Sequence, residues 1–96
     1  MPQIIYAVRA IRDIRRLREF LRPKNPAAAK RSADTIMKAL KILALQPQMG
    51  RPAANMPEEY REWPIPFGDS GYVARYRFDG RTVTILALRH QKEAGF

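Results

Sequence analysis

The C-terminal end of the chain carries the residues best suited to chemistry. The polar run His-Gln-Lys-Glu at 90–93 directly follows an apolar run over residues 82–88. His90 is the only histidine in the sequence and could act as a general acid or base, while Arg75 could bind a phosphate. Such residues would suit metal-independent proton transfer at a phosphate ester. They also fit a structural role, with His90 capping a strand and Arg75 and Arg77 on a solvated sheet face.

The composition limits the chemistry further. The sequence has no cysteine, which excludes disulfides, thiolate catalysis and cysteine-based zinc sites. A single histidine does not favour a metal site, because zinc usually takes several His or Cys ligands. We therefore expect no metal and no cofactor. No run approaches the ~18 apolar residues of a membrane span, and the N-terminus lacks a signal-peptide pattern, so we expect a cytoplasmic protein without membrane association.

Charge is distributed unevenly along the chain. The formal net charge is +9, and residues 1–51 hold twelve Lys/Arg against three Asp/Glu, while residues 52–96 hold six of each. The whole excess therefore lies in the first half. A basic surface of this kind favours nucleic acid or an acidic protein as partner. The alternative is that these residues only keep the helices soluble.

A short strand and two helices are expected in the first half. Residues 3–6 are β-prone, and apolar residues recurring every three or four positions predict a helix over residues 8–21. Asn25-Pro26 is a helix start signal, and the second helix should run to near residue 46. The linker is short, so the two helices should form an antiparallel hairpin. The expected buried stripes are Ile11, Ile14, Leu17 and Leu21 in the first helix and Ala29, Ala33, Ile36, Met37, Leu40, Leu43 and Ala44 in the second.

The second half is expected to form a sheet after a loop over residues 46–57. Three strands are predicted, over residues 61–67, 71–78 and 82–91. Two prolines make the first of them an edge or irregular strand, and Asp79-Gly80 predicts a tight hairpin between the other two. The apolar run of the last strand predicts burial on both faces and a central position.

These elements predict one α+β domain over residues 1–96. Its expected order is an N-terminal strand, an antiparallel helical hairpin and a three-stranded antiparallel sheet. The two helical stripes should face the same way and need the sheet to cover them.

Several short motifs along this pattern resemble one protein family. They are A-x-x-D-I at 10–14, N-P-A-A-A at 25–29, L-x-x-x-P-x-x-G-R-P at 43–52, Arg61-Glu62 opening a strand, G-Y-V-x-x-Y-R at 71–77 and V-T-I-L-A-L-R-H at 83–90. In this order they resemble the RelE/ParE superfamily, the toxin half of type II toxin–antitoxin modules, over nearly the whole chain. The resemblance implies a toxin held in a hetero-oligomer by a cognate antitoxin that is acidic and partly disordered.

The resemblance implies one of two activities. RelE-like members cut mRNA in the ribosomal A site, which would make His90, Arg75 and Glu93 catalytic and the ribosome and mRNA partners. ParE-like members poison DNA gyrase and need only a binding surface. Val73 replaces an arginine of RelE-like nucleases, and Phe96 stands where a catalytic tyrosine would be expected. Gyrase poisoning is therefore favoured. A degenerate toxin that only binds antitoxin and helps autoregulate its operon is a third possibility.

Antitoxin binding is common to both branches. We expect it at the hairpin groove or at the edge strand near Trp63, where a partner helix or strand could dock. The alternative is that these apolar residues are used up by the domain's own core. The candidate partner-binding residues are Trp63, Arg77, Arg89, Lys92, Ile14, Leu17 and Leu21.

Overall fold

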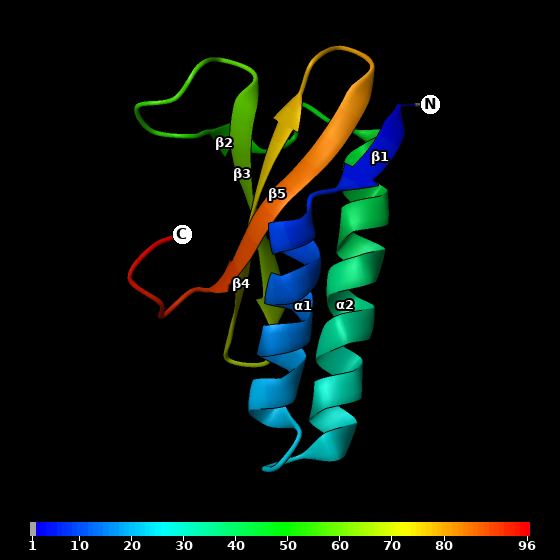
Figure 1. The fold of residues 1–96 in the computed structure, drawn as a ribbon, viewed down its shortest axis with the longest axis vertical. Helices are drawn as coiled ribbons and strands as arrows, with labels where there is room; N and C mark the ends of the chain where they lie inside the picture. The colour runs from blue at the N-terminus through cyan, green and yellow to red at the C-terminus, as the bar shows by residue number, and fades with distance from the viewer. Residues whose placement is uncertain (1) are drawn as a thin grey trace.

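One strand and two helices precede four further strands in the fold (Figure 1). The structure is a computed structural model, and it describes residues 2–96. The elements are β1 (Gln3–Tyr6), α1 (Val8–Leu21), α2 (Pro26–Leu45), β2 (Arg51–Pro52), β3 (Tyr60–Phe67), β4 (Ser70–Phe78) and β5 (Thr82–His90). This confirms the predicted α+β class and the predicted order of elements. No helix within residues 2–96 combines the length and the apolar character needed to cross a bilayer.

The strands form one mixed sheet in the order β1-β5-β4-β3-β2. β1 pairs with β5 in parallel, and the other neighbours are antiparallel. The segment 46–57, expected to be a loop, contains the extra strand β2. Its two residues pair with Arg61 and Glu62 of β3. Only the remainder of β3, which contains both prolines, is a free edge, so the edge prediction holds for that part of the strand.

The helices form the predicted hairpin and pack on one face of the sheet (Figure 1). The Asn25 side chain accepts a hydrogen bond from the Ala28 amide at 3.0 Å, which confirms the predicted N-cap. In α1 the stripe is rotated from the predicted one, because Ala10, Asp13 and Leu17 are its buried residues. Ile11 is 49% exposed, so its assignment to the core was wrong.

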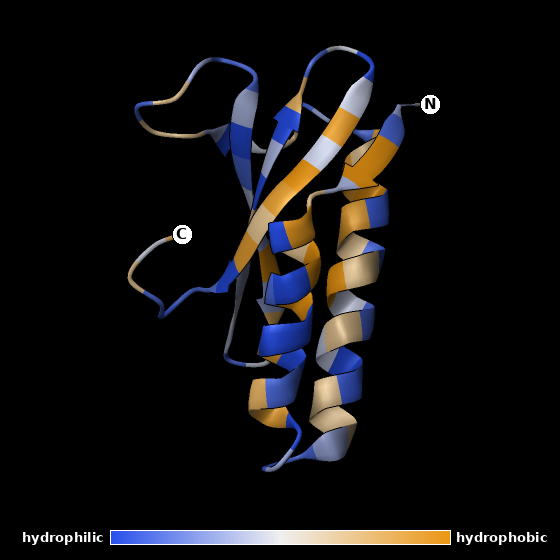
Figure 2. Cartoon of the chain, in the orientation of Figure 1, coloured by the Kyte–Doolittle hydropathy of each residue, from blue (hydrophilic) through white to orange (hydrophobic). Residues whose placement is uncertain are grey.

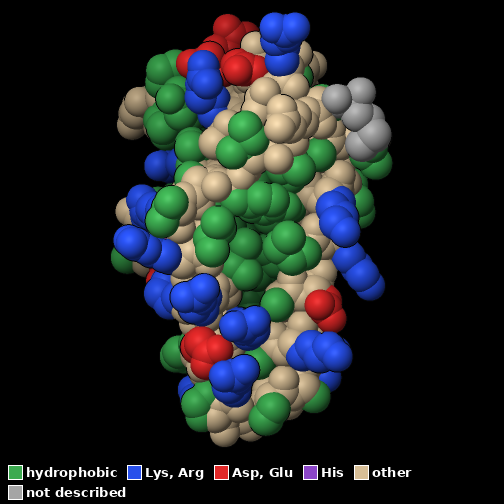
Figure 3. Space-filling view, turned by 45° about the vertical axis from the view of Figure 1, so that its right-hand side comes forward, with side chains coloured by type: hydrophobic (Ala, Val, Ile, Leu, Met, Phe, Trp, Pro, Cys, Tyr) green, Lys and Arg blue, Asp and Glu red, His purple; other side chains and the backbone are tan. Residues whose placement is uncertain are grey.

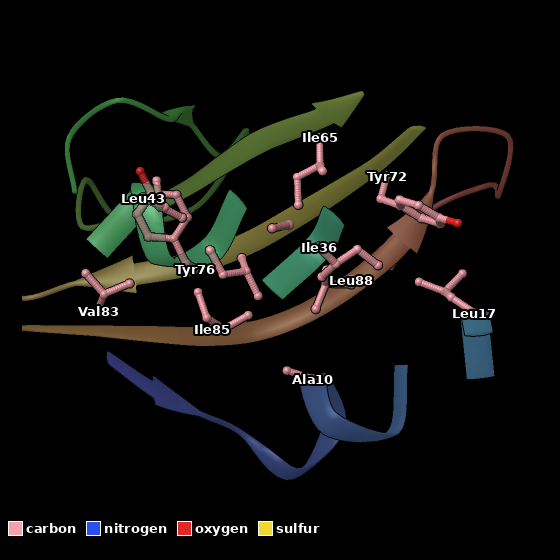
Figure 4. Close-up of a cluster of buried hydrophobic side chains, with 12 residues drawn as sticks. Ala10, Leu17, Ile36, Leu43, Ile65, Tyr72, Tyr76, Val83, Ile85 and Leu88 are labelled. Atoms are coloured by element: carbon pink, nitrogen blue, oxygen red, sulfur yellow. The ribbon is translucent and has the colours of Figure 1, made fainter. Parts of the chain in front are cut away.

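Alternate residues of the strands meet the helices in a single core (Figure 4). On the helix-facing side of β4, Tyr72, Ala74 and Tyr76 are all buried. The middle strand is β4, whereas β5 is an interior strand between β1 and β4. β5 is nonetheless apolar along most of its length (Figure 2). The prediction of a central strand was therefore one position off in order, although β5 does lie between two other strands.

A bulge in β5 changes its alternation. Arg75 pairs with Ala87 and Tyr76 pairs with Ile85, which leaves Leu86 as the extra residue. Beyond the bulge, Ala87 and Leu88 point to opposite faces and both are buried. The two-sided burial predicted for the whole strand is confined to this place.

Tyr76 fastens the segment after α2 to the sheet. Its buried hydroxyl donates to the Pro47 carbonyl at 2.6 Å and accepts from the Gly50 amide at 2.9 Å. A side chain at Gly50 would not fit, because a Cβ there would lie 2.5 Å from the Tyr76 oxygen. Arg61 adds a bond to the Gly50 carbonyl at 2.7 Å. Pro47 and Gly50 of the motif at 43–52 therefore both form hydrogen bonds with the Tyr76 hydroxyl.

We expect Tyr76→Phe to lower the free energy of unfolding by about 1–3 kcal/mol, because the buried Gly50 amide loses its acceptor. Urea denaturation measures the loss. The control is Tyr6→Phe, which removes the hydroxyl of a partly buried tyrosine in β1. Equal stability of the two variants would contradict this role of Tyr76.

Candidate functional site

His90, the candidate acid or base, is held at the end of β5 by three contacts. Its Nε2 lies 3.0 Å from the Ser70 hydroxyl, and its Nδ1 accepts from the Lys92 amide at 3.1 Å. The ring also packs edge-on against Tyr72, with centroids 5.6 Å apart. Because Nδ1 accepts, the proton of the neutral ring belongs on Nε2, where it is donated to Ser70. Both ring nitrogens are thus engaged within the domain.

Arg75 lies on the other face of the sheet, which we call the open face because no helix covers it. Its Nη2 and Nε donate to one carboxylate oxygen of Glu62, at 2.7 and 3.1 Å. Glu62 stands directly opposite Arg75 in the β3–β4 pairing, and its second oxygen is 3.7 Å from Arg51. The two guanidinium groups and one carboxylate form a cluster in which Glu62 and Arg75 are partly buried and Arg51 is exposed.

Glu93 closes the end of β5. One of its oxygens accepts from the His90 amide at 2.8 Å, and the other pairs with Arg16 of α1 at 2.9 Å. The His90 amide, with a smaller contribution from Arg16, lowers the pKa of Glu93 below its ordinary value. A carboxylate held ionised in this way is a poor proton donor near neutral pH.

The three candidate catalytic residues are therefore not assembled into one site. His90 pairs with Tyr72, which faces the helices, whereas Arg75 is three residues further along β4 and faces the open side. Glu93 touches the His90 backbone rather than its ring. Among residues 2–96, no group of three or more acidic or histidine side chains could hold a metal ion.

The candidate partner-binding residues occupy different surroundings. Leu17 is 5% exposed and belongs to the core, so it offers no binding surface, while Ile14 is partly buried against that core. Trp63 also packs against the core rather than standing out as an anchor. Arg77 is paired with Glu59 at 3.3 Å. The remaining candidates are the half-buried Leu21, the tail-bound Arg89 and the exposed Lys92.

A cleft lies between the ends of the two helices. Its volume is about 290 Å³, and it is lined by Arg18, Arg22, Pro26, Ala29, Lys30, Ala33 and Asp34. Three cations and one carboxylate thus surround small apolar side chains. Figure 3 shows a hollowed apolar strip on this side of the molecule with Lys and Arg on both sides of it. The helical hairpin therefore presents a basic, apolar groove.

Sequence reasoning missed Asp13 as a key residue. Asp13 is buried, and its carboxylate accepts from the Leu88 amide of β5 at 2.9 Å. Arg16, one turn on, lies 3.4 Å from the Leu88 carbonyl. The sequence did contain a signal for the burial of Asp13, because it lies three residues after Ala10 and four before Leu17, on the apolar side of α1.

Two solved structures share this fold. A structure of the chromosomal ParDE TA system from P. aeruginosa matches with a TM-score of 0.74 at 16% identity, covering 94% of this chain and 96% of that one. The structure of YafQ from E. coli strain BL21(DE3) matches with a TM-score of 0.56 at 13% identity, covering 95% and 94%. The architecture is thus shared with these two structures.

The sequence relatives identify the family. The profile described as "ParE toxin of type II toxin-antitoxin system, parDE" matches residues 4–95. Toxin RelE1 of Caulobacter vibrioides is 38% identical over 90 residues, covering 94% of both chains. Toxin RelE3 of the same organism is 36% identical over 94 residues, covering 97% of this chain and 98% of that relative. The chain belongs to the ParE toxin family of the RelE/ParE superfamily, which confirms the resemblance.

We expect Asp13→Ala to lower the free energy of unfolding by about 1–3 kcal/mol, because the buried Leu88 amide is left without an acceptor. Asp13→Asn should lose less, since its amide oxygen can still accept. Asp34→Ala, at an exposed position of α2, is the matched control. Denaturant unfolding gives the stabilities and hydrogen exchange follows the Leu88 amide. An Asp13→Ala variant as stable as the control would refute the assignment.

Proposed function

We propose that this toxin inhibits growth by binding and poisoning DNA gyrase. The observation that carries the proposal is the separation of His90 and Arg75 on opposite faces of the sheet. Cleavage of RNA without a metal requires a base, an acid and cations around one phosphate. Here each candidate is engaged in holding the fold: His90 by Ser70, Arg75 by Glu62 and Glu93 by Arg16. A toxin that acts by binding needs no such assembly.

Two further positions support the same proposal. Val73, which replaces the arginine of RelE-like nucleases, is buried in β4. Phe96 has no hydroxyl to serve as a catalytic tyrosine would. The match to the ParE family profile also favours this proposal, whereas the relatives from Caulobacter vibrioides carry the name RelE.

A gyrase assay with purified, antitoxin-free protein tests the proposal. We expect inhibition of supercoiling with trapped, cleaved DNA. His90→Ala and Arg75→Gln should retain most of this inhibition, provided that circular dichroism shows the variants folded. Two results would overturn the proposal: unchanged supercoiling with folded protein that stops growth in cells, or loss of growth inhibition in a folded His90→Ala variant.

We propose that the cognate antitoxin docks a helix in the groove of the hairpin. The groove suits an acidic amphipathic helix, because cations flank an apolar floor. Arg18, Arg22 and Lys30 outnumber Asp34, so the local charge complements an acidic partner. Exposed Ile11, on the same helix as Arg18, is a further apolar contact available to such a partner.

We expect Ala33→Glu to weaken antitoxin binding about tenfold or more, that is by about 1.4 kcal/mol, because it places bulk and negative charge in the cleft. Ala27→Glu, at an exposed position in the first turn of α2, is the control. Calorimetric titration with the cognate antitoxin measures both. Equal affinity of the two variants for the antitoxin would contradict docking in the groove of the hairpin.

A further inference from the structure

The end of the chain folds back over the open face of the sheet. After β5, residues 91–96 leave the edge of the sheet, and Gly95 adopts a φ of 145°, a conformation that favours glycine. The ring of Phe96 then lies over the guanidinium groups of Arg75, at 4.4 Å, and Arg89, at 5.1 Å. The chain end is visible beside the sheet, away from the helices (Figure 1). One aromatic ring thus covers two cations from neighbouring strands.

Hydrogen bonds along part of each guanidinium edge hold both arginines in place. Arg75 directs Nε and Nη2 at Glu62. Arg89 directs Nη1 at three carbonyls of the turn, those of His90, Gln91 and Glu93, at 3.1–3.2 Å. Guanidinium groups bind phosphate through in-plane N–H donors and bind aromatic rings through their faces. These bonds hold the two guanidinium groups in place, and the group that lies against both faces in the structure is an aromatic ring, so the surface suits an aromatic side chain.

The charge around the ring is unbalanced. Arg75 and Arg89 both lie against the Phe96 ring, and the Glu62 carboxylate contacts Arg75 and Arg51. Arg77 is already matched by Glu59 and Asp79. An aromatic residue with acidic neighbours would therefore complement the site better than an isolated ring.

We infer that the faces of Arg75 and Arg89 form a binding site for an aromatic side chain of an acidic polypeptide, and that Phe96 occupies this site within the chain. The partner's ring and Phe96 compete for the same two guanidinium faces. The occupied form is a self-bound state from which the partner must displace the ring. The site is separate from the hairpin groove, because it lies on the opposite side of the sheet from the helices.

The test uses the full chain and a blocked peptide, acetyl-Glu-Glu-Phe-Glu-Glu-amide, as the probe. We expect Phe96→Ala to bind the peptide about tenfold more tightly than the wild type, because the internal competitor is removed. Gly95→Ala keeps the ring but strains its placement, so it should also gain affinity, by a smaller factor. NMR titration that follows the Nε–H signals of Arg75 and Arg89 gives the affinity and the location together.

Phe20→Ala is the matched control, since Phe20 is 67% exposed and stacks on Lys24 at 4.5 Å. It should bind the peptide like the wild type. Adding Arg75→Gln to Phe96→Ala should cancel the gain in peptide affinity. The peptide acetyl-Glu-Glu-Ala-Glu-Glu-amide lacks the aromatic ring, and its affinity for each variant should be no higher than its affinity for the wild type.

Three results would overturn the inference. They are equal affinity of wild type and Phe96→Ala for the aromatic peptide, equal gain with the alanine peptide, and tighter binding of a single-stranded RNA oligomer than of the peptide to Phe96→Ala. Gyrase takes no part in the measurement, so its outcome is independent of the proposed target.

Discussion

The structure depends on hydrogen-bond partners for the backbone of β5 beyond Ile85, where no neighbouring strand lies on the β1 side. The parallel neighbour β1 ends at Tyr6, opposite Ile85, while β5 continues to His90. Buried backbone groups without partners are costly, so the amides facing this edge need acceptors. Asp13 supplies one for Leu88 and Glu93 supplies one for His90, at 2.9 and 2.8 Å. Side chains thus replace a missing strand, and they fix α1 and the chain end against the sheet.

This constraint supports the proposal that the polar cluster at the end of the chain holds the strand end rather than forming a catalytic site. Glu93 is held between Arg16 and the His90 amide, so its charge stabilises the strand end. The His90 ring in turn forms hydrogen bonds with the Ser70 hydroxyl at the start of β4 and with the Lys92 amide after β5. A histidine, a lysine and a glutamate close in sequence suggest acid–base chemistry, yet here they complete a strand terminus. What the fold leaves available is binding surface: the groove of the hairpin and the arginine faces of the open side.

Local signals in the sequence were enough to predict the elements but not their mutual placement. Asn25-Pro26 and Asp79-Gly80 are signals read within a few residues, and both predictions hold in the structure. The rotation of α1 could not be read from apolar spacing, because the polar Asp13 occupies a buried position. The separation of His90 from Arg75 follows from strand pairing, in which Tyr72 and not Arg75 stands opposite His90. The position of Phe96 depends on the turn after β5, which no motif predicts.

We propose that this toxin acts by binding rather than by cutting RNA. A ribosome-dependent cleavage assay tests it most directly: purified, antitoxin-free protein is added to translating ribosomes, and primer extension maps any breaks in the mRNA. At toxin concentrations that inhibit gyrase, we expect no mRNA breaks beyond those seen without toxin. Breaks within the A-site codon that disappear in a folded His90→Ala variant would contradict it.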